Sequence, residues 1–152
     1  MIRVSGIKLQ SGALPYRVEA DGSVRVLLVT TSRAHRWSIP KGRAEPHLSL
    51  AENAAKEAFE ETGVTGEIAP QAAGMFRAVK RVGFAESVIE VWVFALRVTS
   101  MAADWPEKRR RQTRWVSCAE AARLLREPLL RTVCLQLATD QAVGSTGLKH
   151  AS

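Results

Sequence analysis

The chain has few cysteines, few histidines and no long apolar run. Its two cysteines, Cys118 and Cys134, match no zinc-ligand spacing, so we expect free thiols and no disulfide or zinc site. The three histidines are equally scattered. No apolar stretch is long enough to span a bilayer, and the first residues lack the apolar core of a signal peptide. We therefore expect a cytoplasmic protein with no membrane partner.

Acidic residues are in the minority. The 15 Asp and Glu residues face 22 Lys and Arg residues, which leaves a formal net charge of +7. Such an excess suits an anionic partner, either a polyphosphate or a nucleic acid. Aromatic residues make up only 6% of the chain and do not interleave with the basic runs, which argues against general nucleic-acid binding. The run at 108–111 fits a phosphate-binding loop and a solvated turn equally well.

Length and composition are typical of one compact domain. The chain has 152 residues, of which 46% are hydrophobic and 24% charged, and it contains no internal repeat and no linker. We expect a single domain over residues 1–140. Residues 141–152 are small and polar, and we expect them to form a flexible tail. The sequence leaves the oligomeric state open.

Three glutamates give the strongest local signal. Glu57, Glu60 and Glu61 follow the i, i+3, i+4 spacing of one helical face and fall within a sector of roughly 100°. The opposite side carries apolar side chains, namely Ala51, Ala54, Ala55, Ala58 and Phe59. Acidic runs of this kind often form only a solvated helix face. Crowded carboxylates also repel one another, however, and hard oxygen ligands suit Mg²⁺ or Mn²⁺.

Both ends of this predicted helix carry boundary signals. Ser49 with Glu52 three residues later forms a capping-box pattern at the start. Gly63 stands where a left-handed glycine would end the helix. We expect residues 39–42 to be a rigid loop that leads into it.

The segment from Gly42 to Val64 resembles the Nudix box. The two glycines and the acids at 57, 60 and 61 fall on the pattern, but two positions depart from it: Leu48 replaces a glutamate and Lys56 replaces an arginine. The resemblance implies an α/β fold, a Nudix-type α/β/α sandwich with a mixed β-sheet between helices. It also implies that Gly42, Lys56 and Gly63 support the box. Lysine lacks the planar fork with which arginine holds a carboxylate, so we expect a looser support.

The resemblance extends over approximately residues 10–130. Its further motifs are Ser11 to Arg17, Trp37 to Gly42, and the pair Trp105 and Trp115. Together they resemble the diphosphoinositol polyphosphate and diadenosine polyphosphate phosphohydrolase branch of the family.

Strand and helix signals elsewhere agree with an α/β domain. We expect strands at 24–29, 88–98 and 112–116, and one or two more within 66–80. A hairpin turn is expected at Asp21-Gly22. Ser117 with Glu120 predicts a helix through Leu125, and Pro128 is expected to open a last helix that ends near Leu137.

The resemblance assigns metal and catalytic roles. It implies that Glu57, Glu60 and Glu61 hold Mg²⁺, for which Mn²⁺ is a possible substitute. Bound metal polarises phosphoryl oxygens and lowers the pKa of water. We expect Glu57 or Glu60 to accept the proton of the attacking water, with Glu86 or Glu90 as alternative bases.

Basic residues near the box are candidates for binding substrate phosphates. We assign this role to Arg17, Lys41 and Arg43, since guanidinium and ammonium groups bind phosphate oxygens.

Three functions fit these residues. The leading one is a Mg²⁺-dependent pyrophosphohydrolase that cleaves a phosphoanhydride bond in a highly phosphorylated small molecule, of the diadenosine polyphosphate or diphosphoinositol polyphosphate type. The second is a pyrophosphohydrolase acting on the 5′ end of RNA. The third, motivated by Leu48 and Lys56, is a catalytically weakened Nudix ligand-binding or regulatory module.

Overall fold

The computed structural model describes the backbone of residues 3–150 and the side chains of residues 6–141. The strands are β1 (Arg3–Val18), β2 (Val24–Thr30), β3 (Trp37–Ser38), β4 (Lys41–Arg43), β5 (Val64–Ile68), β6 (Gly74–Val82), β7 (Ala85–Met101) and β8 (Thr113–Ser117). The helices are α1 (Leu50–Thr62), α2 (Cys118–Leu124) and α3 (Pro128–His150). None of the described helices is long and apolar enough to cross a membrane.

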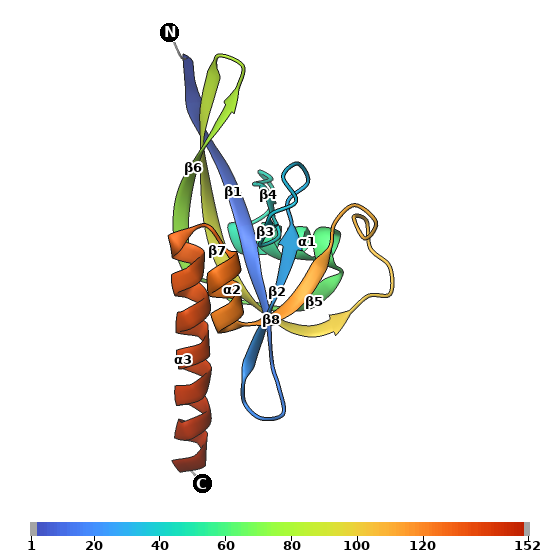
Figure 1. Cartoon of the computed structure of the whole chain (residues 1–152), viewed down its shortest axis with the longest axis vertical. Helices are drawn as coiled ribbons and strands as arrows, with labels where there is room; N and C mark the ends of the chain where they lie inside the picture. Colours follow the sequence, from blue (N-terminus) through green and yellow to red (C-terminus); the bar gives the residue numbers. More distant parts are fainter. Residues whose placement is uncertain (1–2, 151–152) are drawn as a thin grey trace.

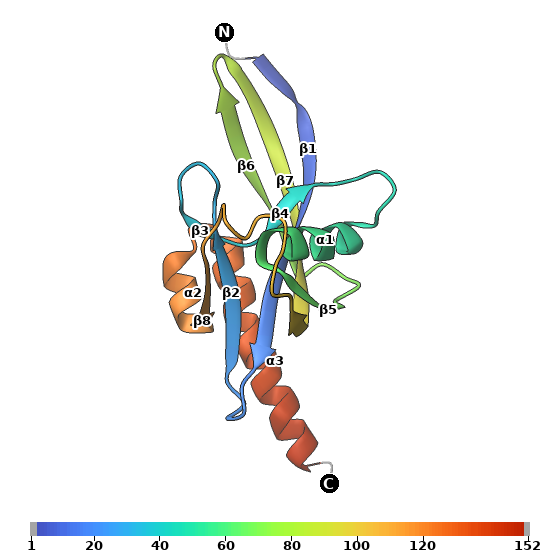
Figure 2. The same ribbon diagram turned by 90° about the vertical axis from the view of Figure 1, so that its right-hand side faces the viewer.

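The strands form one mixed sheet between helices, which confirms the predicted fold class. Its main path runs β3-β2-β1-β7-β5, with β4 beside β1, β6 beside β7 and β8 beside β2. The pairing of β1 with β7 is parallel, whereas the other ladders are antiparallel. Helix α1 lies on one face and helices α2 and α3 lie on the other (Figures 1 and 2).

The sheet has a hydrophobic core on each face, and neighbouring apolar residues on the central strands contribute to both. On β1, Ala13 packs toward α1 and Leu14 toward α2 and α3; on β2, Leu27 and Leu28 divide in the same way. All four are at most 1% exposed. Because successive side chains of a strand point to opposite faces, a strand covered on both faces needs a continuous apolar run, as predicted for β2.

Strand β1 was not predicted. It spans 16 residues and pairs with β7 along most of its length. Its sequence contains Gly6, Gly12 and Pro15, which weaken any local strand signal, so this strand is specified by its partner strand. The N-terminal half of β1 extends with β6 and β7 beyond the rest of the sheet as an arm (Figure 2).

Both ends of α1 match the sequence prediction. Ser49 and Glu52 form the reciprocal capping box, and Gly63 ends the helix with φ 78°. The segment before the helix differs in part from the predicted loop, because Lys41–Arg43 forms β4. This short strand pairs antiparallel with residues 10–12 of β1.

Both C-terminal helices begin where predicted, and α2 also ends as predicted, with Leu125 as its C-cap, whereas α3 ends later. Ser117 caps α2, and Pro128 is the first residue of α3. The last helix does not end near Leu137, since it continues to His150. Gly144 and Gly147 are poor helix formers, so local propensity predicts an earlier end than the structure has. Residues 151–152, the end of the predicted flexible tail, lie outside the described residues.

Candidate active site

The close contact between β4 and α1 sets the geometry of the site. A Cβ atom on Gly42 would lie 2.3 Å from the carboxyl carbon of Glu57, so only glycine fits at this position while Glu57 stays in place. Gly63 has a related role at the other end of α1, where a Cβ atom would lie 2.4 Å from the ring of Trp105. The two glycines of the box thus allow Glu57 to lie against β4 and the ring of Trp105 to lie against the end of α1.

Glu61 is the most buried acid of the box. Its side chain is 3% exposed, accepts a hydrogen bond from the backbone N–H of Lys41 at 3.2 Å, and lies 3.5 Å from the guanidinium of Arg111. Burial raises the pKa of Glu61 to about 8; Arg111 opposes this shift, and the carboxylates of Glu107 and Glu57 add to it. The alternative of a solvated helix face does not hold for this acid, because it points inward, where a backbone donor and a guanidinium partly compensate its burial.

Glu57 lies beside Glu61. Burial is the largest cause that raises the pKa of Glu57, the charge of Glu60 is the next, and a hydrogen bond with Glu61 opposes them. Two carboxylates joined by a hydrogen bond cannot both be ionised without repulsion, so one of them retains a proton more readily than an isolated acid.

Glu60 makes a different contact from the other two acids. Its Oε1 atom lies 2.7 Å from the ammonium group of Lys56, which also lies 3.1 Å from Glu45. The three predicted acids therefore divide into an acid pair, in which Glu61 is buried and Glu57 partly buried, and a third acid that is held by a lysine on its own helix.

The loop between β7 and β8 adds two residues that the sequence analysis did not assign to the site. The backbone N–H of Glu107 donates to the carbonyl of Glu60 at 2.9 Å, and the Nε of Arg111 donates to the side chain of Glu107 at 2.9 Å. Arg111 also donates to the carbonyl of Thr30 at 3.0 Å. The i, i+4 spacing of Glu107 and Arg111 was the available signal. The basic run at 108–111 divides in consequence: Arg111 lies in the site, while Arg109 and Arg110 are exposed.

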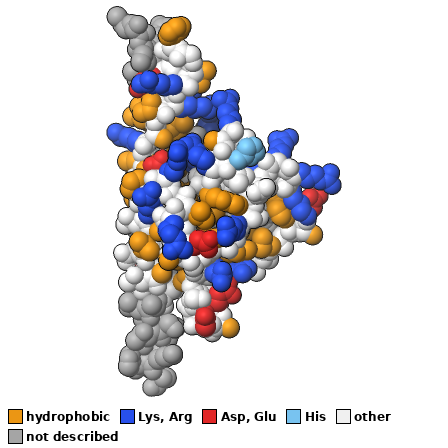
Figure 3. Space-filling model, viewed as in Figure 1, with side chains coloured by type: hydrophobic (Ala, Val, Ile, Leu, Met, Phe, Trp, Pro, Cys, Tyr) orange, Lys and Arg blue, Asp and Glu red, His pale blue; other side chains and the backbone are white. Residues whose placement is uncertain are grey.

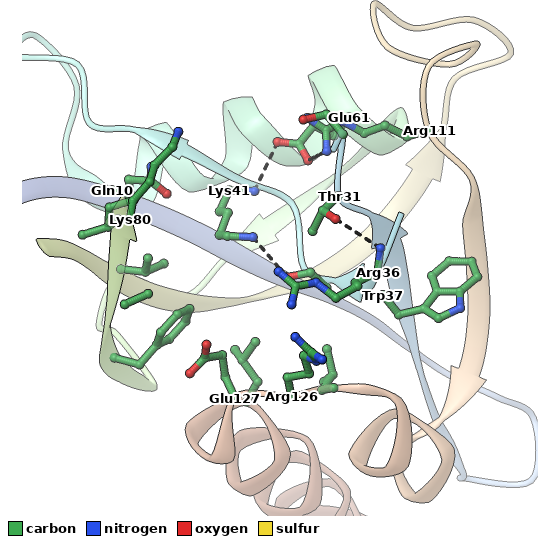
Figure 4. Close-up of a pocket in the computed structure, with 18 residues that line it drawn as sticks. Gln10, Thr31, Arg36, Trp37, Lys41, Glu61, Lys80, Arg111, Arg126 and Glu127 are labelled. Carbon is green, nitrogen blue, oxygen red and sulfur yellow. Dashed lines mark hydrogen bonds and ion pairs between the residues drawn. The ribbon is translucent and has the colours of Figure 1, made fainter. Parts of the chain in front are cut away.

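A cavity of about 580 Å³ opens beside Glu61, between the sheet and the α2–α3 side of the molecule (Figure 4). Five cationic side chains line it: Arg36, Lys41, Lys80, Arg111 and Arg126. Its apolar wall includes Phe76 and Leu130, and Trp37 also contributes. Basic side chains outnumber acidic ones on the surrounding surface (Figure 3). A concave site with these cations suits a ligand that carries several phosphates.

Of the three predicted phosphate-binding residues, only Lys41 lines this cavity. Its Nζ donates to the Ser38 hydroxyl at 3.1 Å, and burial lowers the pKa of Lys41 while Glu61 opposes the shift. Arg43 lines a separate cavity of about 450 Å³. Arg17 lies 4.2 Å from the ring centroid of Trp115 and pairs with Glu19 at 2.7 Å.

The two alternative bases are held by other partners. Glu86 pairs with Arg81 at 3.1 Å and Glu90 pairs with Arg77 at 3.0 Å, in both cases across the β6–β7 ladder. Neither acid lines the 580 Å³ cavity.

The donor set fits a divalent cation. Within the described residues, no group of three or more His, Cys, Asp or Glu side chains is already arranged to hold a metal. Burial is nevertheless the largest cause that raises the pKa values of both Glu57 and Glu61, and neighbouring carboxylates add to it. A hard divalent cation would compensate their negative charge and prefers carboxylate oxygens.

Comparisons with known proteins identify the family of the chain. A family model described as NUDIX domain matches residues 9–135. The chain is 32% identical over 138 residues to Nudix hydrolase 12, mitochondrial, of Arabidopsis thaliana, which covers 80% of this chain and 68% of the relative. It is 36% identical over 125 residues to Nudix hydrolase 4 of the same plant, covering 77% and 58%. Diphosphoinositol polyphosphate phosphohydrolase 2 of Rattus norvegicus is 30% identical over 123 residues, covering 79% and 64%.

Solved structures share the fold. A C. elegans Ap4A hydrolase in a binary complex matches with a TM-score of 0.61 at 17% identity, covering 89% of this chain and 98% of that one. The NUDIX domain of Shewanella oneidensis NrtR, complexed with ADP ribose, matches with a TM-score of 0.58 at 19% identity, covering 91% and 88%.

Proposed function

The chain belongs to the Nudix hydrolase family, and we propose that it hydrolyses a phosphoanhydride bond in a highly phosphorylated small molecule with the help of Mg²⁺. The observation that carries this proposal is the position of Glu61, the buried member of the acid pair. Glu61 lines a cavity that also holds five cationic side chains, so acids suited to a metal and cations suited to phosphates meet in one place.

We assign the metal to Glu57 and Glu61, with Glu60 as a third ligand. Mg²⁺ bound there would polarise a phosphoryl oxygen and make bound water more acidic. Glu57 is our first candidate for the acceptor of the water proton, because it lies beside Glu61 and its pKa is raised by burial and by the charge of Glu60. Glu60 is the second candidate. The structure gives less support to Glu86 and Glu90, whose carboxylates are paired with arginines on β6.

We assign phosphate binding to the cationic side chains that line the cavity beside Glu61. Lys41 and Arg111 lie beside Glu61, so they are placed to bind the phosphates next to the cleaved bond. Arg36, Lys80 and Arg126 complete the lining and would bind more distant phosphates (Figure 4). Charge developing on the leaving group would be stabilised by these fixed cations. We keep Arg17 and Arg43 as outer contacts for a longer substrate.

The names of two similar proteins support this substrate class. One is a diphosphoinositol polyphosphate phosphohydrolase and the other an Ap4A hydrolase. Two alternatives remain from the sequence analysis. Trp37 and Phe76 in the cavity wall offer stacking surfaces for the 5′ end of an RNA. The two departures from the box pattern, Leu48 and Lys56, motivate a module that binds phosphate without efficient turnover. The cytoplasmic location also stays a prediction, because several relatives are named mitochondrial or chloroplastic.

A substrate panel tests the proposal. Diadenosine tetraphosphate, a diphosphoinositol polyphosphate and a 5′-triphosphorylated RNA would each be incubated with the protein and Mg²⁺, with a chelator as the control. We expect metal-dependent turnover of at least one of the two small molecules. Turnover of the RNA alone would support the second function. Binding of all three without any product would support the third.

A further inference from the structure

The segment that joins β4 to α1 is tied to the helix by one lysine. The Nζ atom of Lys56 lies 3.1 Å from Oε1 of Glu45 in this segment and 2.7 Å from Oε1 of Glu60 one helical turn later. Hydrogen bonds to Glu60 and Glu45 are the two largest causes that raise the pKa of Lys56. The ammonium group therefore bridges two carboxylates, one on each side of it.

This bridge includes Lys56, one of the two positions at which the chain departs from the box pattern; Leu48 is the other. Position 48 carries a leucine, which lines an apolar part of the 450 Å³ cavity together with Leu9 and Leu50. The acid that faces Lys56 stands three residues earlier, at Glu45. A leucine at position 48 cannot pair with Lys56, and Glu45 supplies the carboxylate of this segment that does.

We propose that Glu45 is a positioning residue for the metal site. It holds the ammonium group of Lys56 in the orientation that binds Oε1 of Glu60, and the described contacts of Glu60 leave Oε2 available for a cation. The proposal rests on the proposed function for its metal. In the described contacts, Glu45 itself touches neither Glu57 nor Glu61, and it does not line the cavity beside Glu61.

The order of Lys56 and Glu60 along α1 explains why a second partner of Lys56, Glu45, matters. A lysine four residues before a glutamate is the weaker of the two orders for a helical ion pair. The side chains of Lys56, Glu60 and Glu45 are also 32–38% exposed, and ion pairs at such sites stabilise proteins only slightly. Without Glu45, Lys56 would therefore be expected to leave Glu60 more often, with little effect on folding.

The test must separate positioning from the simple loss of a negative charge. Glu45→Asp keeps the charge but withdraws the carboxylate by one methylene group. We expect this variant to bind Mn²⁺ about three- to tenfold more weakly, measured by electron paramagnetic resonance without substrate. In a Lys56→Met background the same substitution should have no effect, because no ammonium group remains to be held. Glu120→Asp is the matched control, since Glu120 is 33% exposed and forms one ion pair, with Arg114.

Three outcomes would overturn the proposal: Mn²⁺ affinity of Glu45→Asp within twofold of the wild type, a loss that persists in full in the Lys56→Met background, or an equal loss in Glu120→Asp. Thermal denaturation of each metal-free variant would show that the fold is retained. Because Mn²⁺ binding is measured without substrate, the positioning role can hold even if the substrate panel shows no hydrolysis. A wild-type protein that binds no Mn²⁺ would overturn both proposals.

Discussion

At the scale of single residues, the two glycines of the box are needed because other groups come close to them. Gly42 gives the clearest test. In Gly42→Ala the new methyl group would lie 2.3 Å from the carboxyl carbon of Glu57, so Glu57 must move. We expect turnover to fall on the order of 100-fold, since small displacements of a reacting group have effects of that size.

The control for this variant is Gly6→Ala, because a Cβ atom at Gly6 would meet nothing within 4 Å. Turnover should be compared for the two variants under identical Mg²⁺ concentrations, with circular dichroism to establish that both are folded. Near-normal turnover of folded Gly42→Ala would show that the position of Glu57 is not critical.

The acids and the cations of the site should affect different kinetic constants. Glu60→Gln keeps the shape of the side chain but removes a charge that we assign to the metal, so kcat should fall by orders of magnitude. Lys41→Ala should mainly raise KM, because a phosphate contact is made in both the ground state and the transition state.

Both variants should be measured on substrates that differ by one phosphate. The effect of Lys41→Ala should be larger for the longer substrate. A Lys41 variant with no dependence on chain length would remove that residue from the polyphosphate site, and a Glu60 variant with normal kcat would remove Glu60 from catalysis.

The identity of the acids could be predicted from the sequence, but their partners could not. Spacing identified Glu57, Glu60 and Glu61. Their different surroundings depend on residues far away in the chain, since Arg111 lies 50 positions after Glu61 and bonds to Thr30. Among the basic residues near the box, local order could not distinguish Lys41, which lines the cavity, from Arg43, which does not.

At the scale of elements, α1 positions the acids and its capping box positions α1. Ser49 and Glu52 each bond to the other's backbone N–H, at 3.0 Å and 2.9 Å. At the start of α2, only the bond from the N–H of Glu120 to the Ser117 hydroxyl is described.

Ser49→Ala should therefore lower the free energy of unfolding by about 1 kcal/mol, and Ser117→Ala by no more than that. Urea denaturation of the two variants and the wild type measures both values. A stability loss at Ser117 that clearly exceeds the loss at Ser49 would contradict this role of the box.

The elements that the sequence predicted are those with local signals. Caps and glycine defined α1, and apolar runs defined β2 and β7. Strand β1 lacks such a local signal and is specified by its pairing with β7. Close packing requires glycine at position 12 of this strand, because a Cβ atom there would lie 2.9 Å from the Ile39 side chain. A glycine selected for close approach weakens the strand signal that a β-branched residue would have given.

At the scale of the whole molecule, the fold gathers distant segments around a charge that it does not fully compensate. Strand β4, helix α1 and the loop before β8 all contact Glu61 or its neighbours. This arrangement makes stability depend on pH. The pKa of Glu61 is about 8 in the folded state against an ordinary value of 4.5, so the native state binds more protons than the unfolded state between these values.

This difference in proton binding sets the direction in which stability changes with pH. Without metal, the stabilisation is present below pH 4.5, and the free energy of unfolding should fall as the pH rises toward 8, by at most about 1.4 kcal/mol per pH unit for one group. The raised pKa of Glu57 acts in the same direction. The lowered pKa values of Glu52 and Glu90 act in the opposite direction, but only below about pH 4.5, where those acids become protonated.

Mg²⁺ should reverse this loss, because it binds the ionised carboxylates of the native state and competes with their protons. Urea denaturation between pH 5.5 and 8.5, with chelator or with Mg²⁺, would measure the effect, and the stabilisation by Mg²⁺ should grow as the pH rises. In Glu61→Gln the metal-free decline should become smaller, and the response to Mg²⁺ should weaken. A metal-free profile that is flat, or that is unchanged by this substitution, would show that Glu61 is already ionised in the native state and that groups such as Arg111 fully compensate its charge.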